Sequence, residues 1–149
     1  MEASREHIHV SGLEMRYGAR VIQRGLDFRV MRGDVFVIMG GSGCGKSTLL
    51  KHMIGLHEPA AGEVLYNGVS YQRCNAEARA AMRRRWGITY QSGGLFSAMT
   101  LAENIALPLT QYTTLDPASV RELVAYKLAL VGLAGFEEYY PAEIGRAHV

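Results

Sequence analysis

The sequence has few cysteines, no long apolar run and little net charge, and each shortage excludes a class of protein. Two of its 149 residues are cysteine, Cys44 and Cys74, so no disulfide framework is expected and a reducing compartment suits the chain. No apolar stretch approaches the roughly 20 residues of a membrane-spanning helix. Residues 1–6, MEASRE, lack the apolar core of a secretory signal peptide. We therefore expect a cytoplasmic protein that reaches any membrane process through a partner.

The charge balance also argues against one class of partner. The formal net charge is +2 at pH 7, which is too small to indicate nucleic-acid binding. The local basic run Arg83–Arg85 is interpreted as a solvated helix face. With 48% hydrophobic and 20% charged residues, the composition is that of an ordinary globular protein, and the length allows one domain at most.

What the sequence does contain is a phosphate-binding pattern. Eight consecutive residues, followed by Thr48, match G-x-x-x-x-G-K-S/T: Gly40, Gly41, Ser42, Gly43, Cys44, Gly45, Lys46 and Ser47. Five apolar residues, Val35–Met39, precede the pattern, and a run compatible with a helix, Leu49–Ile54, follows it. This is the strand–loop–helix context that a P-loop requires. The sequence therefore predicts a binding site for a nucleoside triphosphate.

Each residue type in the pattern suits a triphosphate. Glycines allow several backbone N–H groups to converge on an anion, and the following helix adds the positive end of its dipole. Lys46 supplies a mobile charge for the β- and γ-phosphates, and Ser47 offers a hydroxyl to Mg²⁺. Thr48 is expected near the α-phosphate. Cys44 is either a small side chain that fits a variable position or a reactive thiol at a helix N-terminus.

The remaining elements are predicted from local patterns. The predicted strands are 7–16, 21–30, 35–39, 64–66, 69–71 and 87–90, with an Asn67-Gly68 hairpin turn, and a helix is predicted over 76–85. Thr100 and Glu103 form a capping box for a helix that is expected to stop before Pro108. A second helix starts at Asp116-Pro117, and Gly132 ends it. Its apolar stripe is Val120, Leu123, Val124, Leu128 and Val131.

In this order of elements the chain resembles the ATP-binding subunit of ABC transporters. About forty residues of mostly β character precede the P-loop, where most other P-loop proteins have one strand. Tyr17 matches the aromatic residue that stacks on adenine, and residues 40–48 match Walker A. Pro59–Glu63 matches the family's Pro-x-x-Gly hairpin, and Gln91 matches the Q-loop glutamine. The resemblance implies that Gln91 contacts Mg²⁺, orients the attacking water with Lys46 as the other catalytic residue, and lies near the membrane subunits.

The resemblance also implies a fold, ligands and partners. The fold class is α/β: an N-terminal antiparallel β subdomain, the start of a RecA-like core and part of a helical subdomain, so that residues 1–142 form an incomplete nucleotide-binding domain. The ligands would be ATP and Mg²⁺. The partners would be transmembrane permease subunits and a second ATPase subunit in a homodimer, with no nucleic acid, on the inner face of a bacterial inner membrane.

A narrower resemblance covers Gln91–Leu109. The segments Gln91–Phe96, Met99-Thr100, Glu103–Ile105 and Leu107–Leu109 look like the ATPase of Mla-type, MCE-linked lipid transporters. It implies that the complete protein powers phospholipid transport across the cell envelope. The alternatives are a soluble ABC ATPase outside transport, an ABC ATPase that serves another transported substrate, and a non-catalytic nucleotide sensor.

The C-terminal residues depart from the family. The signature motif, Walker B, the catalytic glutamate and the switch histidine are not found, and His148 has no family context. Residues 143–149 back-translate to GAG ATC GGA AGA GCA CAC GTC, which resembles a sequencing-library adapter, so we expect a non-native tail from adapter read-through. Resequencing the source DNA tests this: a native stop codon directly after Val149 would contradict it. The 149-residue chain is expected to be inactive as an ATPase, at most a weak nucleotide binder, and prone to aggregation.

Overall fold

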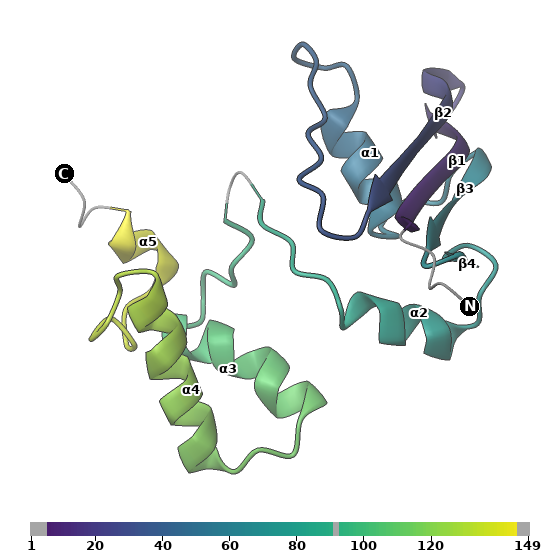
Figure 1. The fold of residues 1–149 in the computed structure, drawn as a ribbon. Coiled ribbons are helices and arrows are strands. Elements are labelled where there is room, and N and C mark those ends of the chain that lie inside the picture. The colour runs from purple at the N-terminus through teal and green to yellow at the C-terminus, as the bar shows by residue number, and fades with distance from the viewer. Residues whose placement is uncertain (1–5, 91–92, 146–149) are drawn as a thin grey trace. The chain divides into compact units, whose positions relative to one another are not determined.

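The chain forms two compact units, Met1–Gly87 and Ile88–Val149, in a computed structural model (Figure 1). The structure describes residues 6–90 and 93–145. The two units are described separately, since each has its own buried apolar cluster.

The first unit is built on a four-stranded antiparallel sheet. Its strand order is β2-β1-β3-β4, with β1 at Glu6–Tyr17, β2 at Arg20–Met31, β3 at Ala61–Tyr66 and β4 at Val69–Ser70. The two long strands predicted near the N-terminus are confirmed, each one residue longer at both ends. Pairing of Tyr17 with Arg20 closes the β1–β2 hairpin, so the end of β1 lies at a tight turn.

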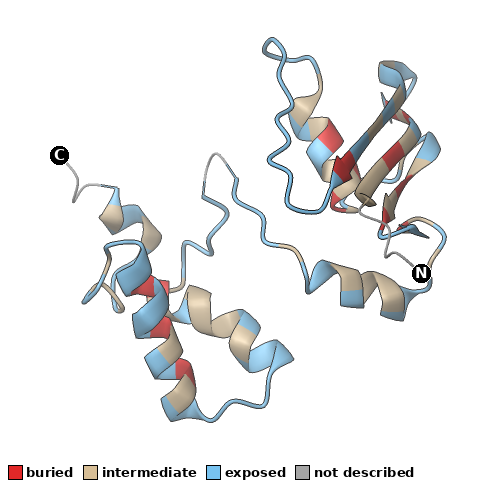
Figure 2. Cartoon of the chain, in the orientation of Figure 1, coloured by how far each residue is buried: buried red, intermediate tan, exposed pale blue. Residues whose placement is uncertain are grey.

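Helix α1, Lys46–Met53, packs on this sheet through a small apolar core. Leu49 of α1 is buried with Val10, Leu13 and Met15 of β1 and with Val64 of β3 (Figure 2). These strand residues are at most 1% exposed. Burial of a side chain of this size contributes about 1.5–3 kcal/mol, so this cluster fixes the start of α1 against β1.

The β3–β4 hairpin has the turn that the sequence predicts. Asn67 and Gly68 both have positive φ, 50° and 79°, as a type I′ turn requires. The Asn67 N–H also donates to the carbonyl of His7 at 2.9 Å, which ties the turn to β1. Helix α2, Ala76–Arg83, follows, and the Asn75 side chain accepts a hydrogen bond from the Ala78 N–H at 2.9 Å.

Two predicted strands are wrong. Residues 35–39 and 87–90 are not strands in the structure, and Tyr90 makes only an isolated bridge with Gly93. Val35 is 93% exposed and Met39 is 87% exposed, although Phe36 stacks on Phe28 with ring centroids 5.0 Å apart. A strand forms by pairing with a neighbour, and in the described residues no segment forms a ladder with either run. Apolar pattern alone therefore does not make these residues strands.

The second unit contains α3 at Leu101–Tyr112, α4 at Pro117–Leu130 and α5 at Pro141–Ile144. The capping box is confirmed: Thr100 Oγ1 accepts from the Glu103 N–H at 3.1 Å, and Glu103 Oε2 accepts from the Thr100 N–H at 2.7 Å. The predicted stop before Pro108 is wrong, because α3 continues through it. Ile105 and Leu109, on both sides of Pro108, pack in the same cluster with α4, and this packing offsets the missing backbone hydrogen bond.

Helix α4 follows its predicted start and stop. Asp116 accepts from the N–H groups of Ala118 and Ser119, and Pro117 is the first helical residue. Gly132 ends the helix in a Schellman motif, in which its own N–H bonds to the Ala129 carbonyl and the next N–H bonds to that of Leu128. Of the predicted stripe, Val120, Val124 and Leu128 are buried and Leu123 is partly buried. Val131, which follows the last helical residue, is 67% exposed.

No helix in the described part of the chain is both long and apolar enough to cross a bilayer.

Candidate nucleotide-binding site

The phosphate-binding pattern forms a loop that ends at the first turn of α1. Gly45 is the N-cap residue, with φ at 101°, and Lys46 begins the helix. A Cβ atom at Gly45 would lie 2.8 Å from Ile22 Cγ2 and 3.5 Å from Met15 Cε. The loop therefore approaches the β1–β2 hairpin so closely that only glycine fits, in backbone geometry as well as in space.

The N-terminus of α1 is open. Gly45 provides no side-chain cap, and the first turn contains no acidic residue. In contrast, side chains of Asn75, Thr100 and Asp116 cap α2, α3 and α4. The first backbone N–H groups of a helix have no intrahelical partner, and together with the helix dipole they favour an anion. The geometry of α1 thus suits a phosphate.

Lys46 reaches back across the loop. Its ammonium Nζ donates to the carbonyls of Gly40 at 2.7 Å and Gly41 at 2.8 Å, and it lies 3.6 Å from Cys44 Sγ. The Cys44 N–H closes the loop with a 3.4 Å bond to the Gly41 carbonyl. These contacts hold a positive charge where the loop and the first turn of α1 meet.

Tyr17 brings an aromatic ring to the same turn. Its hydroxyl lies 3.5 Å from Thr48 Oγ1, and the side chain is 49% exposed. The ring of His57 meets it edge-on, with centroids 5.9 Å apart and planes at 83°. An aromatic ring that is half exposed beside a phosphate loop can stack on a nucleobase.

A buried histidine lies behind this ring pair. His52 of α1 is 2% exposed, and its Nδ1 lies 3.0 Å from the carbonyl of His57. A carbonyl only accepts, so Nδ1 carries the proton. Nε2 is buried and has no hydrogen-bond partner among the described residues, and desolvation lowers the pKa of His52. His52 is therefore a neutral side chain that holds the loop carrying His57 against α1.

The structure brings most of the predicted site residues together. Tyr17, the loop glycines, Lys46 and Thr48 surround the start of α1, with Ser42 and Gly43 exposed in the loop and Ser47 exposed on the first turn. Gln91 lies outside the described residues. Two contributors were missed: Gln23, whose Nε2 donates to the Cys44 carbonyl at 3.4 Å, and His57. No sequence pattern marks either one, because both act through tertiary contacts.

The Mg²⁺ predicted at Ser47 would need further ligand atoms from the bound nucleotide. In the residues that the structure describes, no group of three or more His, Cys, Asp or Glu side chains could hold a metal ion. Mg²⁺ is commonly held by one or two protein oxygens together with substrate phosphates. The exposed Ser47 hydroxyl beside the open N-terminus of α1 fits that arrangement.

The glycine loop, the open helix and Lys46 define a P-loop protein, the class that binds phosphate groups on a helix N-terminus. A family profile described as ABC transporter matches residues 23–143. The chain therefore belongs to the ABC transporter family of ATP-binding domains.

Curated relatives agree with this family. The chain is 38% identical over 137 residues to the "probable ribonucleotide transport ATP-binding protein mkl" of Mycobacterium tuberculosis, covering 92% of this chain and 38% of that protein. It is 37% identical over 137 residues to the intermembrane phospholipid transport system ATP-binding protein MlaF of Haemophilus influenzae, covering 92% of this chain and 52% of that one. The chain thus spans about 38–52% of the length of these relatives.

Solved structures show the same fold. A dimeric bacterial ABC transporter cassette, MJ0796, matches with a TM-score of 0.81 at 24% identity, covering 91% of this chain and 62% of that one. The ATP-binding subunit of an ABC transporter matches with a TM-score of 0.74 at 29% identity, covering 91% and 55%. The predicted fold class is confirmed: the antiparallel sheet and helices correspond to the N-terminal part of an ABC ATPase.

Proposed function

We propose that the chain binds Mg²⁺ and ATP at residues 40–48 and that the complete protein uses ATP hydrolysis to power a membrane transporter. The observation that supports binding is the convergence of Lys46, the open first turn of α1 and the Tyr17 ring at one place. Binding of inorganic phosphate would require only the loop and the first turn of α1. The ring beside Thr48 adds a surface for a base and so favours a nucleotide over inorganic phosphate.

Different residues contact different parts of the nucleotide in this proposal. The N–H groups that open α1 and the Lys46 ammonium hold the phosphate chain, and Lys46 exchanges the carbonyls of Gly40 and Gly41 for phosphate oxygens. Ser47 would offer its hydroxyl to Mg²⁺, which when bound would neutralise phosphate charge. Tyr17 stacks on adenine. Gln91 is proposed as the second metal contact and as the residue that orients water.

Hydrolysis, partners and cargo belong to the complete protein. We propose that it pairs as a homodimer with transmembrane permease subunits on the inner face of a bacterial inner membrane. The Mla-like segment 91–109 and the MlaF relative support phospholipids as the cargo. Other relatives are named for ribonucleotide transport and, at 44% identity over 115 residues in Paraburkholderia xenovorans, for methionine import. Because the relatives' names differ in the transported substrate, phospholipid as the cargo is a narrower proposal than ATP-driven transport.

Calorimetric titration of the chain tests nucleotide binding. Monomer isolated by gel filtration should bind Mg²⁺–ATP, and Lys46→Ala should weaken binding by at least about tenfold, since hydrogen bonds to charged groups contribute about 1.5–3 kcal/mol. Lys51→Ala removes the same charge from the last turn of α1 and should bind as the parent chain does. Equal affinity in Lys46→Ala and the parent chain would contradict the proposal.

A test of the transported substrate requires the protein encoded by the complete reading frame. Purified with its permease in proteoliposomes, the complete ATPase should be stimulated by phospholipid presented with an MCE-type partner protein. Permease and MCE-type genes found beside the complete reading frame would support the same assignment. Stimulation by methionine or a ribonucleotide in place of lipid would overturn the lipid assignment and leave the ATP site intact.

A further inference from the structure

The first unit contains a cavity that the P-loop residues do not line. It has a volume of about 420 Å³, and its walls include His7, Arg32, Asn67, Arg85 and Trp86. Four separate elements supply them: the start of β1, the residue after β2, the β3–β4 turn, and the segment after α2. We propose that this cavity binds a small phosphate-bearing anion, independently of the nucleotide site.

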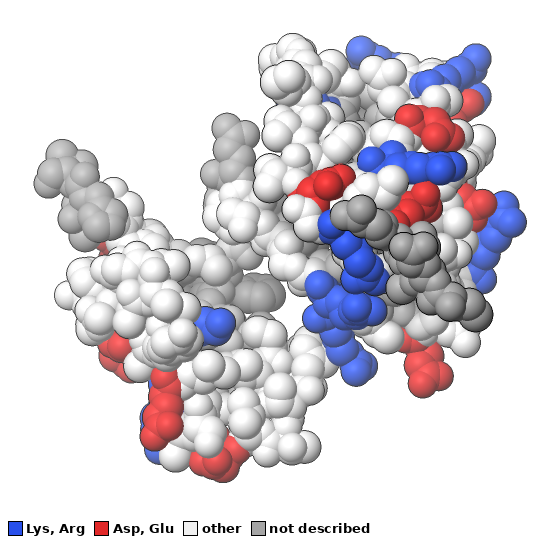
Figure 3. Space-filling model, viewed as in Figure 1, with Lys and Arg blue, Asp and Glu red and all other residues white. Residues whose placement is uncertain are grey.

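The charge of the cavity supports an anionic ligand. Arg32 and Arg85 line it, and none of the acidic residues that the structure describes does. In the described part of the chain neither arginine forms a salt bridge, whereas Arg16, Arg24, Arg29, Arg73 and Arg79 all do. Figure 3 shows further blue side chains gathered at the C-terminal end of α2, where the run 83–85 lies. The two guanidinium groups therefore have donors to spare for phosphate oxygens.

A neutral amide organises the cationic side. The Arg32 Nη2 donates to Asn67 Oδ1 at 2.6 Å, and His7 Nδ1 lies 3.0 Å from the same oxygen. The type I′ turn fixes Asn67, so its side chain holds both groups at the cavity and, being uncharged, does not neutralise the Arg32 guanidinium. A guanidinium that is positioned by a neutral acceptor keeps its full charge for a ligand, and bidentate phosphate contact is the geometry it favours.

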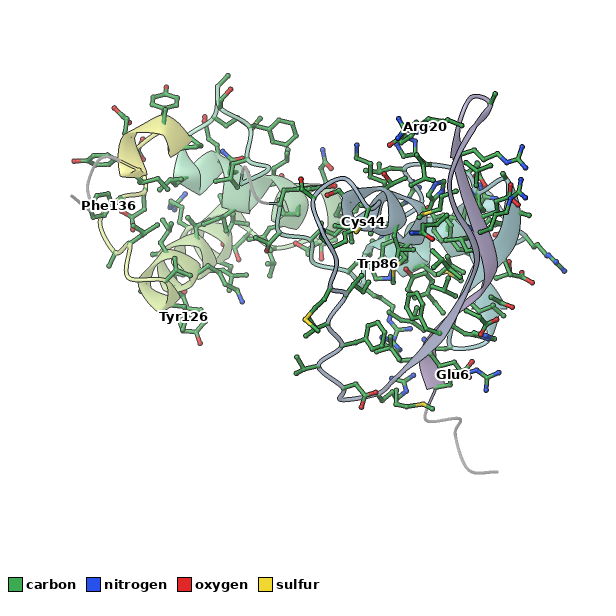
Figure 4. The ribbon with its side chains drawn as sticks, turned by 90° about the horizontal axis from the view of Figure 1, so that it is seen from above. Glu6, Arg20, Cys44, Trp86, Tyr126 and Phe136 are labelled. Carbon is green, nitrogen blue, oxygen red and sulfur yellow. The ribbon has the colours of Figure 1, made fainter. Side chains whose placement is uncertain are left out.

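Aromatic rings also line the cavity. Trp86 is half-buried, and its ring lies 4.7 Å from that of Tyr66 and 5.5 Å from that of Tyr71 (Figure 4 labels Trp86). The Tyr66 hydroxyl donates to the Met53 carbonyl at 2.6 Å, so this residue offers its ring and not its hydroxyl to a ligand. A lining that combines cations with a fixed aromatic group suits a phosphate carried on a small apolar or flat group.

Trp86 is the only tryptophan in the chain, so its fluorescence reports directly on the cavity. The measurement uses the Lys46→Ala chain, in which the P-loop is weakened, and two probes: sodium phosphate, and vesicles of phosphatidic acid in phosphatidylcholine. Either probe should give a saturable fluorescence change. A response to soluble phosphate identifies a free phosphorylated ligand, and a response to the vesicles alone identifies a lipid headgroup.

Arginine variants decide whether the signal comes from the cavity. Arg32→Gln and Arg85→Gln should each weaken binding by at least about tenfold, as expected for a lost charge-assisted hydrogen bond. Arg20→Gln removes the same charge at the β1–β2 turn and should leave binding unchanged. Both arginines are exposed, and circular dichroism checks that the variants fold as the parent does. No saturable change with either probe, an equal change with sodium chloride, or a change that survives both substitutions would overturn the proposal.

Discussion

The hydroxyl of Tyr17, at the end of β1, lies 3.5 Å from the hydroxyl of Thr48, in the first turn of α1. The two residues are 31 positions apart, and Gly45 packs against the intervening hairpin through Ile22. The β1–β2 hairpin and the phosphate loop are therefore packed together, so a change in either one alters the ligand site.

Removing the Tyr17 ring should weaken nucleotide binding. Stacking of a base on an aromatic side chain contributes about 1–3 kcal/mol, so Tyr17→Ala should reduce ATP affinity about 5- to 150-fold. Tyr17→Phe keeps the ring and should stay within about threefold of the parent, since the contact with Thr48 is long. Titration with tripolyphosphate, which has no base, should show equal affinity in all three chains. A parallel loss for tripolyphosphate would mean that Tyr17 supports the loop and not the base.

A methyl group at Gly45 should distort the phosphate loop. Gly45→Ala places a Cβ 2.8 Å from Ile22 Cγ2 at a φ of 101°, and strain of this kind costs about 1–3 kcal/mol. Urea unfolding of the first unit, followed by Tyr and Trp fluorescence, measures the loss. Gly41→Ala is the matched control, because no atom lies within 4 Å of its added Cβ. Equal stability of the two variants would show that the loop is not packed on the hairpin as described.

His52 should make the first unit less stable in mild acid. Desolvation lowers the pKa of His52 in the folded chain below the ordinary value of 6.5. Above pH 6.5 both folded and unfolded states carry the neutral imidazole. As the pH falls below 6.5 the unfolded state gains the proton first, so stability declines until the folded pKa is reached. His52→Gln should flatten the slope of unfolding free energy against pH in this window, and an unchanged slope would contradict the assignment.

Asp116 should make α4 sensitive to stronger acid. Hydrogen bonds from the Ser119 side chain, then from the N–H groups of Ser119 and Ala118, lower the pKa of Asp116 below 3.8. The ionised cap stabilises the helix above pH 3.8, and that stabilisation is lost as the pH falls through the lower, folded pKa. Circular dichroism at 222 nm should show fraying in this window. Asp116→Asn, an equally good cap without a titrating carboxyl, should remove this part of the transition.

The exposed run before the P-loop should drive association of the chain. Val35→Lys with Val37→Lys should reduce light scattering at a given concentration, because both side chains are largely exposed and add no core packing. The unfolding midpoint of the first unit should stay the same. Val64→Lys places a charge in the core and should abolish folding. Unchanged scattering in the double variant would show that another surface is responsible.

Short sequence patterns predicted the features whose hydrogen bonds lie within a few residues of one another. The capping box at Thr100, the cap at Asp116 and the Asn67-Gly68 turn each satisfy their own backbone groups within a few residues, so their sequence sufficed. The same holds for the loop that contains Lys46. The role of Tyr17 in stacking on adenine came from family resemblance and stays a prediction, whereas its contact with Thr48 is a tertiary contact that the sequence did not predict.

The predictions were wrong where contacts between residues distant in the sequence determine the local structure. Residues 35–39 have the apolar pattern of a buried strand, but a strand needs a partner elsewhere in the chain. Pro108 reads locally as a helix stop, and packing of Ile105 and Leu109 with α4 overrides it. His57 and Gln23 carry no pattern, because their contribution comes from contacts with Tyr17 and Cys44.

The nucleotide loop has one anchored flank and one free flank. Leu49 and Gly45 fasten its C-terminal side to β1 and β2, whereas Val35–Met39 on its N-terminal side remain open to solvent. Segments with few buried apolar contacts open first, so the N-terminal side of the loop should open before α1 leaves the sheet.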